Sequence, residues 1–480
     1  MGRTTATRLA GITDRKLETM VGADAGADAR VADLEQALPE VKVLRGLEER
    51  RAHQWDRALD PHAGLPLAVV LPHDTAQVQQ IVRYAAERNI PLVPRGAGSG
   101  LSGGASARAD GIVISMAEMT ALEIDPVTRM AQVEPGVLNA DLKKAAAAVG
   151  LWYPPDPASV EFSSIGGNVA TNAGGLCCVK YGVTTDYVLG VTVVLADGTA
   201  VDLGGPRIKE AAGLSLTKLF VGSEGTLGII TRVVLRLVPP PPPACTVVAT
   251  FSDLGASCQA VLQIASTVRP SMLEFMDDVA VGAVEDVHGY GLDRGAQAML
   301  IAQSDQPGES GRHEVEQIAQ VCRNHGATEV LVTDDDETGR RYTAARRAAI
   351  PAVESRGRLL LGDVGVPLPQ LSALVTGIRE ISARQEVVIS VIAHAGDGNT
   401  HPLVVFDPDD AAQAARAQDA YGQVMDLAIG LGGTITGEHG VGRTKKAWLP
   451  DYVGEDVVHL NRVIKNAVDP KGLLNPGAIL

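Results

Sequence analysis

The chain has 480 residues, 45% of them hydrophobic, which is enough for two or more domains with sizeable cores. Its 42 basic and 57 acidic side chains give a net charge of −15, which argues against nucleic acid or an anionic membrane surface as a partner, since both require a basic protein surface. The five cysteines form no CxxC pair and no run of about 18 apolar residues occurs, so we expect a cytoplasmic protein without a disulfide framework, an iron–sulfur cluster or a membrane span.

The first part of the chain predicts a helical segment followed by a denser α/β unit. Residues 1–60 look polar and helical, and their start lacks the apolar core of a signal peptide. Residues 67–95 predict a strand, a helix and a second strand, with Asp74 as a candidate helix N-cap and a helix end before Asn89. We expect residues 61–240 to form one domain.

A proline-rich boundary is expected near the middle of the chain. Short strands, among them a hairpin at 121–136, are followed by five consecutive prolines at 239–243. Such a run is stiff and extended and continues neither a strand nor a helix. Residues 241–480 then alternate strand-like and helix-like segments, including a polar helix around 334–350 and a helix near 369–384. We expect these residues to form a second domain.

Three glycine-rich loops occur within about 140 residues, at 91–105, 154–175 and 221–231. Small residues let backbone N–H groups crowd against an anion. Residues 98–103 match G-x-G-x-x-G, but a strand rather than a helix follows them, so we do not expect a Rossmann fold. Three such loops suit a long phosphorylated cofactor that touches the backbone at several points.

These loops carry a family resemblance. The segments "VPRGAGSGLSGGA", "GGNVATNAGG" and "GSEGTLGIIT" closely resemble the FAD-binding domain of the vanillyl-alcohol oxidase and p-cresol methylhydroxylase (PCMH) superfamily. The later motifs resemble its FAD-linked D-2-hydroxyacid dehydrogenase branch, which includes D-lactate dehydrogenases, glycolate oxidase catalytic subunits and D-2-hydroxyglutarate dehydrogenases. The resemblance implies an α+β fold, in which a two-subdomain PCMH-type FAD-binding domain precedes an α+β FAD-linked oxidase C-terminal domain with the substrate and metal site.

The resemblance also implies a set of FAD-binding residues. The loop from Arg95 to Ser102 would wrap the pyrophosphate, and the later loops would line the flavin. None of the three loops contains a histidine or tyrosine, so we expect FAD to be non-covalent, with the doublet Cys177–Cys178 as inert packing. The expected cofactor-binding residues are Arg95, Gly96, Ala97, Gly98, Ser99, Gly100, Leu101, Ser102, Pro155, Asp156, Ser159, Gly166, Gly167, Asn168, Ala170, Thr171, Asn172, Gly174, Glu224, Gly228, Ile230 and Asn475.

A histidine-bearing hairpin occurs at residues 390–406, "SVIAHAGDGNTHPLVVF", in which His394 and His401 flank a turn. Two imidazoles at facing strand ends can converge on one divalent ion. The segment "TGEHGVGRTK" offers Glu438 beside His439 as a further ligand, and two histidines with one carboxylate and an open position are typical of a catalytic metal. The resemblance implies His394, His401 and Glu438 as ligands of Zn²⁺ or Mn²⁺, and His439 as the catalytic base.

Two residues are expected to contact the substrate. Arg346 matches a substrate-binding arginine of the related sequences, and a guanidinium grips a carboxylate bidentately. Asn399 is expected to contact the substrate or to support the metal ligands. D-2-hydroxyglutarate dehydrogenases carry a threonine and a lysine for a second carboxylate where this chain has Ile350 and Leu361. This departure favours a short or apolar substrate.

We therefore expect an FAD- and metal-dependent dehydrogenase that oxidises a D-2-hydroxy acid, with D-lactate or glycolate favoured, to the 2-keto acid. Its electrons would pass to an acceptor other than O₂, such as a quinone, a cytochrome or an electron-transfer flavoprotein. Three alternatives stay open: a D-2-hydroxyglutarate dehydrogenase, a flavoprotein subunit of a larger glycolate oxidase complex, and a metal-dependent hydrolase in which the same three ligands activate water. A homodimer is also left open.

Overall fold

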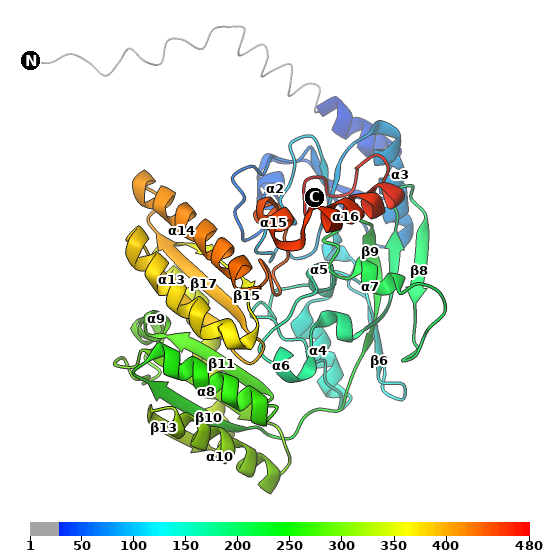
Figure 1. The fold of residues 1–480 in the computed structure, drawn as a ribbon. Helices are drawn as coiled ribbons and strands as arrows, with labels where there is room; N and C mark the ends of the chain where they lie inside the picture. Colours follow the sequence, from blue (N-terminus) through cyan, green and yellow to red (C-terminus); the bar gives the residue numbers. More distant parts are fainter. Residues whose placement is uncertain (1–27) are drawn as a thin grey trace, which may run out of the picture.

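The computed structural model describes residues 28–480, which form two α+β halves (Figure 1). The N-terminal half begins at residue 28 and ends at 238, and the C-terminal half begins at 245. The five prolines join the two halves without helix or strand, as predicted. No helix in the described part of the chain combines the length and the apolar composition needed to cross a membrane.

Residues 28–41 contribute side chains to the core of the N-terminal half, and residues 42–60 lie mostly on its surface. Residues 28–37 are helical and bury Val31 and Leu34 in that core, while residues 1–27 of the expected helical segment lie outside the described residues. Strand β1 (Lys42–Leu44) and helix α2 (Leu47–Ala52) follow. The short strand β1 has no sequence signal because its side chains are exposed or half-buried, so no apolar alternation marks it.

The first sheet has the strand order β1-β2-β4-β3. Helix α3 (Thr75–Arg88) lies between β2 and β3 in the chain and begins and ends as predicted. The Asp74 side chain accepts a hydrogen bond from the first turn, and Asn89 ends the helix in the left-handed conformation. The first glycine-rich loop leaves the end of β3. The three parallel strands are β2 (Ala68–Leu71), β3 (Leu92–Arg95) and β4 (Ile112–Ser115).

The second sheet is antiparallel, with the order β5-β6-β9-β7-β8. Its first two strands are the predicted hairpin. The strands are β5 (Leu122–Asp125), β6 (Met130–Val133), β7 (Val188–Val194), β8 (Ala200–Gly204) and β9 (Ile229–Arg236). Besides the helices already described, this half contains η1 (Met116–Glu118), α4 (Asn139–Ala148), α5 (Ile165–Thr171), α6 (Cys178–Tyr181), η2 (Thr184–Asp186) and α7 (Leu216–Phe220).

The C-terminal half is built on an eight-stranded antiparallel sheet in the order β13-β10-β12-β11-β16-β17-β14, with β15 also pairing to β17. The strands are β10 (Cys245–Phe251), β11 (Met272–Asp277), β12 (Ala298–Ser304), β13 (Ala327–Thr333), β14 (Arg358–Leu361), β15 (Val364–Gly365), β16 (Val388–His394) and β17 (Asn399–Phe406). Four helices pack on one face: α8 (Leu254–Thr267), α10 (Glu309–Asn324), α13 (Leu371–Gln385) and α14 (Ala411–Gly430). Three pack on the other face: α9 (Asp278–His288), α11 (Asp336–Arg347) and α12 (Ala349–Glu354).

The end of the chain returns to the N-terminal half, where α16 is drawn in red (Figure 1). After η4 (Lys446–Trp448) and α15 (Leu449–Val453), helix α16 (Glu455–Val468) packs against the second sheet. Leu474 then joins the core of the first sheet and bridges to Leu92. The final residues of the expected 241–480 domain therefore pack on the preceding one.

Candidate active site

A cavity of about 360 Å³ lies where the two halves meet. The N-terminal half contributes the three glycine-rich loops to its lining, and the C-terminal half contributes Arg346, His394, His401 and His439. The cavity therefore places glycine-rich backbone opposite a wall of titratable side chains. Its volume is within the range of small-molecule sites.

The first glycine-rich loop is held from behind by Arg95. The Arg95 side chain is buried and its Nη1 donates a hydrogen bond to Trp55 O at 2.9 Å. Gly98 has φ +72°, and a Cβ added there would overlap the Arg95 guanidinium. The Arg95 side chain thus fixes the course of the loop, and its glycines bring the backbone close to the cavity.

The second loop is tied to the first by Ser164. Its Oγ accepts hydrogen bonds from the N–H groups of Ala97, at 3.2 Å, and Gly167, at 3.3 Å. The second of these bonds caps the short helix α5. A Cβ at Gly96 would overlap the same oxygen, so glycine is required where the two loops touch.

The third loop reaches across to the C-terminal half through Glu224. This buried side chain accepts hydrogen bonds from the N–H groups of Val441, at 2.7 Å, and Gly442, at 2.8 Å, and burial raises the pKa of Glu224 to about 7. The backbone oxygen of Glu224 accepts a hydrogen bond from Asn475 Nδ2 at 2.7 Å. Glu224 therefore connects a glycine-rich loop to the segment that carries His439.

The alternation of side chains along neighbouring strands brings the hairpin histidines together. In β16 and β17, His394 and His401 lie on the sheet face that α9, α11 and α12 cover. The register pairs His394 with Asn399 and His401 with Ile392, so the two histidines are diagonal neighbours rather than facing residues. Their ring centroids are 5.2 Å apart, and the rings are perpendicular.

Glu438 completes a three-residue cluster with the two histidines. Its Oε1 lies 3.2 Å from His394 Nε2 and 3.2 Å from His401 Nε2, and one ligand atom from each residue lies within 4.8 Å of the others. All three side chains line the cavity. Two imidazole nitrogens and one carboxylate oxygen at this spacing can hold a divalent ion with an open position.

Glu274 on β11 orients one of these histidines. The register of β11 and β16 pairs Glu274 with His394, and Glu274 Oε1 lies 2.9 Å from His394 Nδ1. A carboxylate at Nδ1 fixes the tautomer that leaves Nε2 free as a ligand. Glu274 Oε2 lies 2.9 Å from Arg346 Nη2, so this fully buried carboxylate joins the cluster to the arginine. The sequence signal for Glu274 is a carboxylate among apolar residues of a short strand that ends with a second carboxylate, Asp277.

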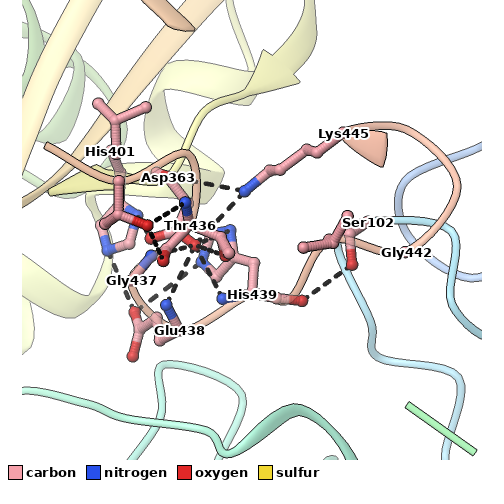
Figure 2. A network of polar contacts seen from close by, with 12 residues as sticks. Ser102, Asp363, His401, Thr436, Gly437, Glu438, His439, Gly442 and Lys445 are labelled. Atoms are coloured by element: carbon pink, nitrogen blue, oxygen red, sulfur yellow. Dashed lines mark hydrogen bonds and ion pairs between the residues drawn. The ribbon is translucent and has the colours of Figure 1, made fainter. Parts of the chain in front are cut away.

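Asp363 organises the loop that carries Glu438 and His439 (Figure 2). Its Oδ2 accepts hydrogen bonds from Thr436 Oγ1 and from three successive backbone N–H groups, at 2.6 to 3.1 Å. Burial alone would raise the pKa of Asp363, but His439, Lys445 and His401 together hold it well below its ordinary value. The ionised carboxylate therefore fixes the direction of both side chains.

His439 lies beside this cluster as a neutral imidazole. Its ring stacks on that of His401, with centroids 4.9 Å apart and an interplanar angle of 6°. Its Nδ1 is 3.9 Å from Asp363 Oδ2, and its backbone oxygen accepts a hydrogen bond from Ser102 Oγ at 2.9 Å. Burial lowers the pKa of His439 to about 4, despite the raising effect of Asp363. The neutral ring can accept a proton at Nε2.

Asp363, His401 and His439 form a second group with metal-ligand spacing. This group is the weaker candidate, because Asp363 Oδ2 already accepts four hydrogen bonds and forms an ion pair with the buried Lys445 at 3.4 Å. Asp363 also does not line the cavity. The group of His394, His401 and Glu438 is the one that faces the cavity.

The wall next to the histidines combines a buried cation with apolar side chains. Arg346 is 3% exposed, and its Nε has no hydrogen-bond partner among residues 28–480. Arg347 also lines the cavity and pairs with Asp156 at 2.7 Å. Ile350 and Leu361, the two apolar departures noted in the sequence, line the same cavity. The wall can bind one carboxylate beside an apolar group.

Comparison with known proteins identifies the family. A family model described as FAD linked oxidases, C-terminal domain, matches residues 240–479, and one described as FAD binding domain matches residues 66–204. The chain belongs to the FAD-linked oxidases. It is therefore an FAD-dependent oxidoreductase, and its α+β fold is the one that the sequence predicts.

Relatives agree with this assignment, and solved structures share the fold. The chain is 38% identical over 431 residues to glycolate oxidase subunit GlcD of Bacillus subtilis, covering 89% of this chain and 92% of that protein. It is 34% identical over 445 residues to a D-lactate dehydrogenase of Archaeoglobus fulgidus, covering 92% and 98%. The fold is similar to that of p-cresol methylhydroxylase, with a TM-score of 0.76, 17% identity and coverage of 91% and 93%. A 4-ethylphenol oxidase from Gulosibacter chungangensis gives a TM-score of 0.74 at 20% identity and the same coverage.

The cavity of this oxidoreductase fits FAD on the glycine-rich side. Positions such as Gly96 and Gly98 have no room for a side chain, and they bring loop backbone to the cavity. Burial raises the pKa of both Cys177 and Cys178 above the ordinary range, so these thiols stay protonated. The expected cofactor residues that line the cavity are Arg95, Gly96, Ala97, Gly98, Ser99, Gly100, Leu101, Ser102, Ser159, Gly166, Gly167, Asn168, Ala170, Thr171, Glu224, Gly228 and Ile230.

Five expected cofactor residues lie outside this lining: Pro155, Asp156, Asn172, Gly174 and Asn475. Asp156 binds an arginine, Asn172 ends helix α5 with φ +53°, and Asn475 supports the third loop from behind. Gly174 faces a second cavity, as does Asn399, which was expected to contact the substrate or to support the metal ligands.

Some lining residues lie outside the motifs found in the sequence. Among them are Asp56, Arg57 and Met116. The first two fall in the polar segment that precedes the first domain, where a pattern of exposed helix gives no signal for a binding site.

Replacing Gly98 with alanine is expected to lower FAD affinity at least about tenfold, a change of about 1.4 kcal/mol. The new Cβ has to displace the buried Arg95 guanidinium and with it the loop. Gly150→Ala is the matched control, because Gly150 has φ +71° and no atom of residues 28–480 lies within 4 Å of its added Cβ. Both variants add left-handed strain of about 1–2 kcal/mol, visible as a lower Tm. Equal FAD affinity in the two variants would contradict this role of the loop.

Proposed function

We propose that this oxidoreductase uses FAD and a divalent metal, Zn²⁺ or Mn²⁺, to oxidise a short 2-hydroxy acid, D-lactate or glycolate, to the 2-keto acid. The observation that carries the proposal is the convergence of His394, His401 and Glu438 on the wall of the cavity that faces the glycine-rich loops. The names of the relatives, a glycolate oxidase subunit and a D-lactate dehydrogenase, support this substrate class.

His394, His401 and Glu438 would hold the metal, which lowers the pKa of a coordinated hydroxyl when bound. FAD, held by the three loops, supplies the hydride acceptor. The other groups belong to the chain itself. Arg346 binds the substrate carboxylate and fixes its orientation, because its buried Nε is free of protein partners within the described residues.

His439 acts as the base in this proposal. Its Nδ1 lies 3.9 Å from Asp363 Oδ2, and its Nε2 lies 3.9 Å from Glu438 Oε1, beside the proposed metal ligands, so Nε2 is the nitrogen placed to accept a proton there. The low pKa of His439, caused mainly by burial, keeps the imidazole neutral over the physiological range. The substrate hydroxyl proton would therefore move to His439 Nε2.

The apolar part of the wall limits the substrate. Ile350 and Leu361 line the cavity and offer no partner for a second carboxylate. A substrate with a hydrogen or methyl group at this place, as in glycolate or D-lactate, leaves no charge without a partner. D-2-hydroxyglutarate would bury a carboxylate against these two side chains.

Anaerobic mixing with a panel of 2-hydroxy acids tests the function. D-lactate and glycolate are expected to bleach the flavin absorbance at about 450 nm, whereas L-lactate leaves it unchanged. D-2-hydroxyglutarate should reduce the flavin more slowly. The variant Leu361→Lys should gain rate with D-2-hydroxyglutarate relative to D-lactate, because it adds a cation to the wall. A flavin that no member of the panel reduces would refute the proposed reaction.

We also propose that the electrons leave to an acceptor other than O₂, namely a quinone, a cytochrome or an electron-transfer flavoprotein. The word subunit in the name of GlcD supports one related alternative, a flavoprotein subunit of a larger glycolate oxidase complex. The same site residues would serve in either case.

A further inference from the structure

A second cavity, of about 420 Å³, lies behind the metal-ligand cluster. His394 and Glu438 line both this cavity and the one that holds the glycine-rich loops. The two ligands therefore form part of the wall between two separate spaces. We propose that the second cavity is the route by which the divalent cation reaches its ligands, an inference that rests on the proposed metal site.

The two cavities differ in the cations that line them. The cavity with the glycine-rich loops is lined by four arginines, Arg57, Arg95, Arg346 and Arg347, together with the acidic Asp56, Glu224 and Glu438. Its arginines suit a phosphorylated cofactor and a carboxylate substrate. The second cavity has no arginine or lysine among its described lining residues, and it carries the carboxylate of Asp397. A dication that approaches through the second cavity therefore passes carboxylates and none of these four arginines.

Asn399, which lines the second cavity, has a buried side-chain oxygen without a partner in the described part of the chain. Asn399 is 9% exposed, and its Oδ1 has no hydrogen-bond partner within residues 28–480. It lies at the start of β17, directly opposite His394 in the strand register. A buried amide oxygen without a partner is costly, and oxygen atoms of this kind bind divalent cations. Together with Asp397, it could bind the cation transiently before the cation reaches His394 and Glu438.

Gly174 keeps the second cavity open toward Glu438. A Cβ at this position would lie 2.6 Å from Glu438 Oε2 and 3.2 Å from Cys178 Sγ, so any side chain would close the gap between these two residues. The ligand carboxylate thus has one oxygen near the histidines and another facing the proposed route. Cation exchange through this side would not require FAD to leave.

The test measures Zn²⁺ uptake by the FAD-loaded protein after its metal has been removed with a chelator, using a zinc indicator in stopped flow. Asp397→Asn removes one charge but keeps the oxygen that accepts the hydrogen bond from Asn399 N. Its association rate is expected to fall about 3- to 10-fold, and the difference should shrink at high ionic strength. Asp409→Asn, an exposed change of the same charge at the far end of the hairpin, should leave the rate unchanged.

Two substitutions of opposite charge at one position give a second test of the route. Val183 lines the second cavity and is not part of the metal cluster. Val183→Arg should slow Zn²⁺ uptake, and Val183→Glu should speed it, each by several-fold. Uptake that is the same in all variants, or that accelerates tenfold when FAD is removed, would overturn the route. A wild-type holoprotein that binds no Zn²⁺ at equilibrium would overturn the proposed metal site as well.

Discussion

Replacing His439 with alanine is expected to lower kcat by about 10²- to 10⁴-fold, the usual contribution of a general base. The variant should still bind FAD, because the contact of residue 439 with the first loop runs through its backbone oxygen to Ser102 Oγ. The stacked neighbour His401 is also retained, so the metal cluster should stay loaded. Steady-state kinetics, flavin absorbance and metal content together separate loss of the base from loss of either cofactor.

His459→Ala is the control for this variant, since His459 is an exposed histidine on helix α16. It should have wild-type kcat. A near-normal kcat in His439→Ala would exclude His439 as the base and would leave Asp363 and Lys445, which hold its loop, as structural groups only.

Glu438→Gln is expected to abolish stable metal binding and to lower kcat to the level of the chelator-treated protein. The amide has the same shape, but it removes the charge that lies 3.2 Å from both His394 Nε2 and His401 Nε2. Loss of a residue that only supports metal ligands typically weakens affinity 10- to 100-fold, so loss of a ligand should exceed about 100-fold. Metal content by mass spectrometry and titration with Mn²⁺ or Zn²⁺ measure the effect.

Glu329→Gln makes the same chemical change at an exposed position on β13 and should leave the metal content and kcat unchanged. Removing the metal from the wild-type protein with a chelator should stop turnover, and added Zn²⁺ or Mn²⁺ should restore it. Full activity in a metal-free protein would remove the metal from the proposed reaction, while flavin reduction by D-lactate would still support oxidation of a hydroxy acid.

The segment from Glu438 to Lys445 is where the two halves of the protein depend on each other. Asp363 of the C-terminal half binds its first backbone N–H groups, and Glu224 of the N-terminal half binds those of Val441 and Gly442. The proposed base and one proposed metal ligand are thus held against the glycine-rich loops by two buried carboxylates. A shift of one half relative to the other would move His439 away from the flavin side of the cavity.

Features that depend on local residue types could be predicted from the amino-acid sequence. Short segments predict these features, because turn chemistry and ligand chemistry are local properties. They include the glycine-rich loops, the histidine hairpin, the neighbouring Glu438 and His439, and the apolar Ile350 and Leu361. The helix that Asp74 begins and Asn89 ends is readable for the same reason.

The residues that support the candidate active site became visible only in the folded protein. Glu274 meets His394 across 120 positions of the chain because β11 and β16 become neighbours in the sheet, and Asp363 meets His439 across 76 positions. Strand order and register arise from the packing of whole elements. They place Asn399 in the lining of the second cavity rather than in the cavity that contains Arg346. The residues of a short segment do not specify which strand will lie next to it. The partners of its side chains are therefore known only from the folded structure.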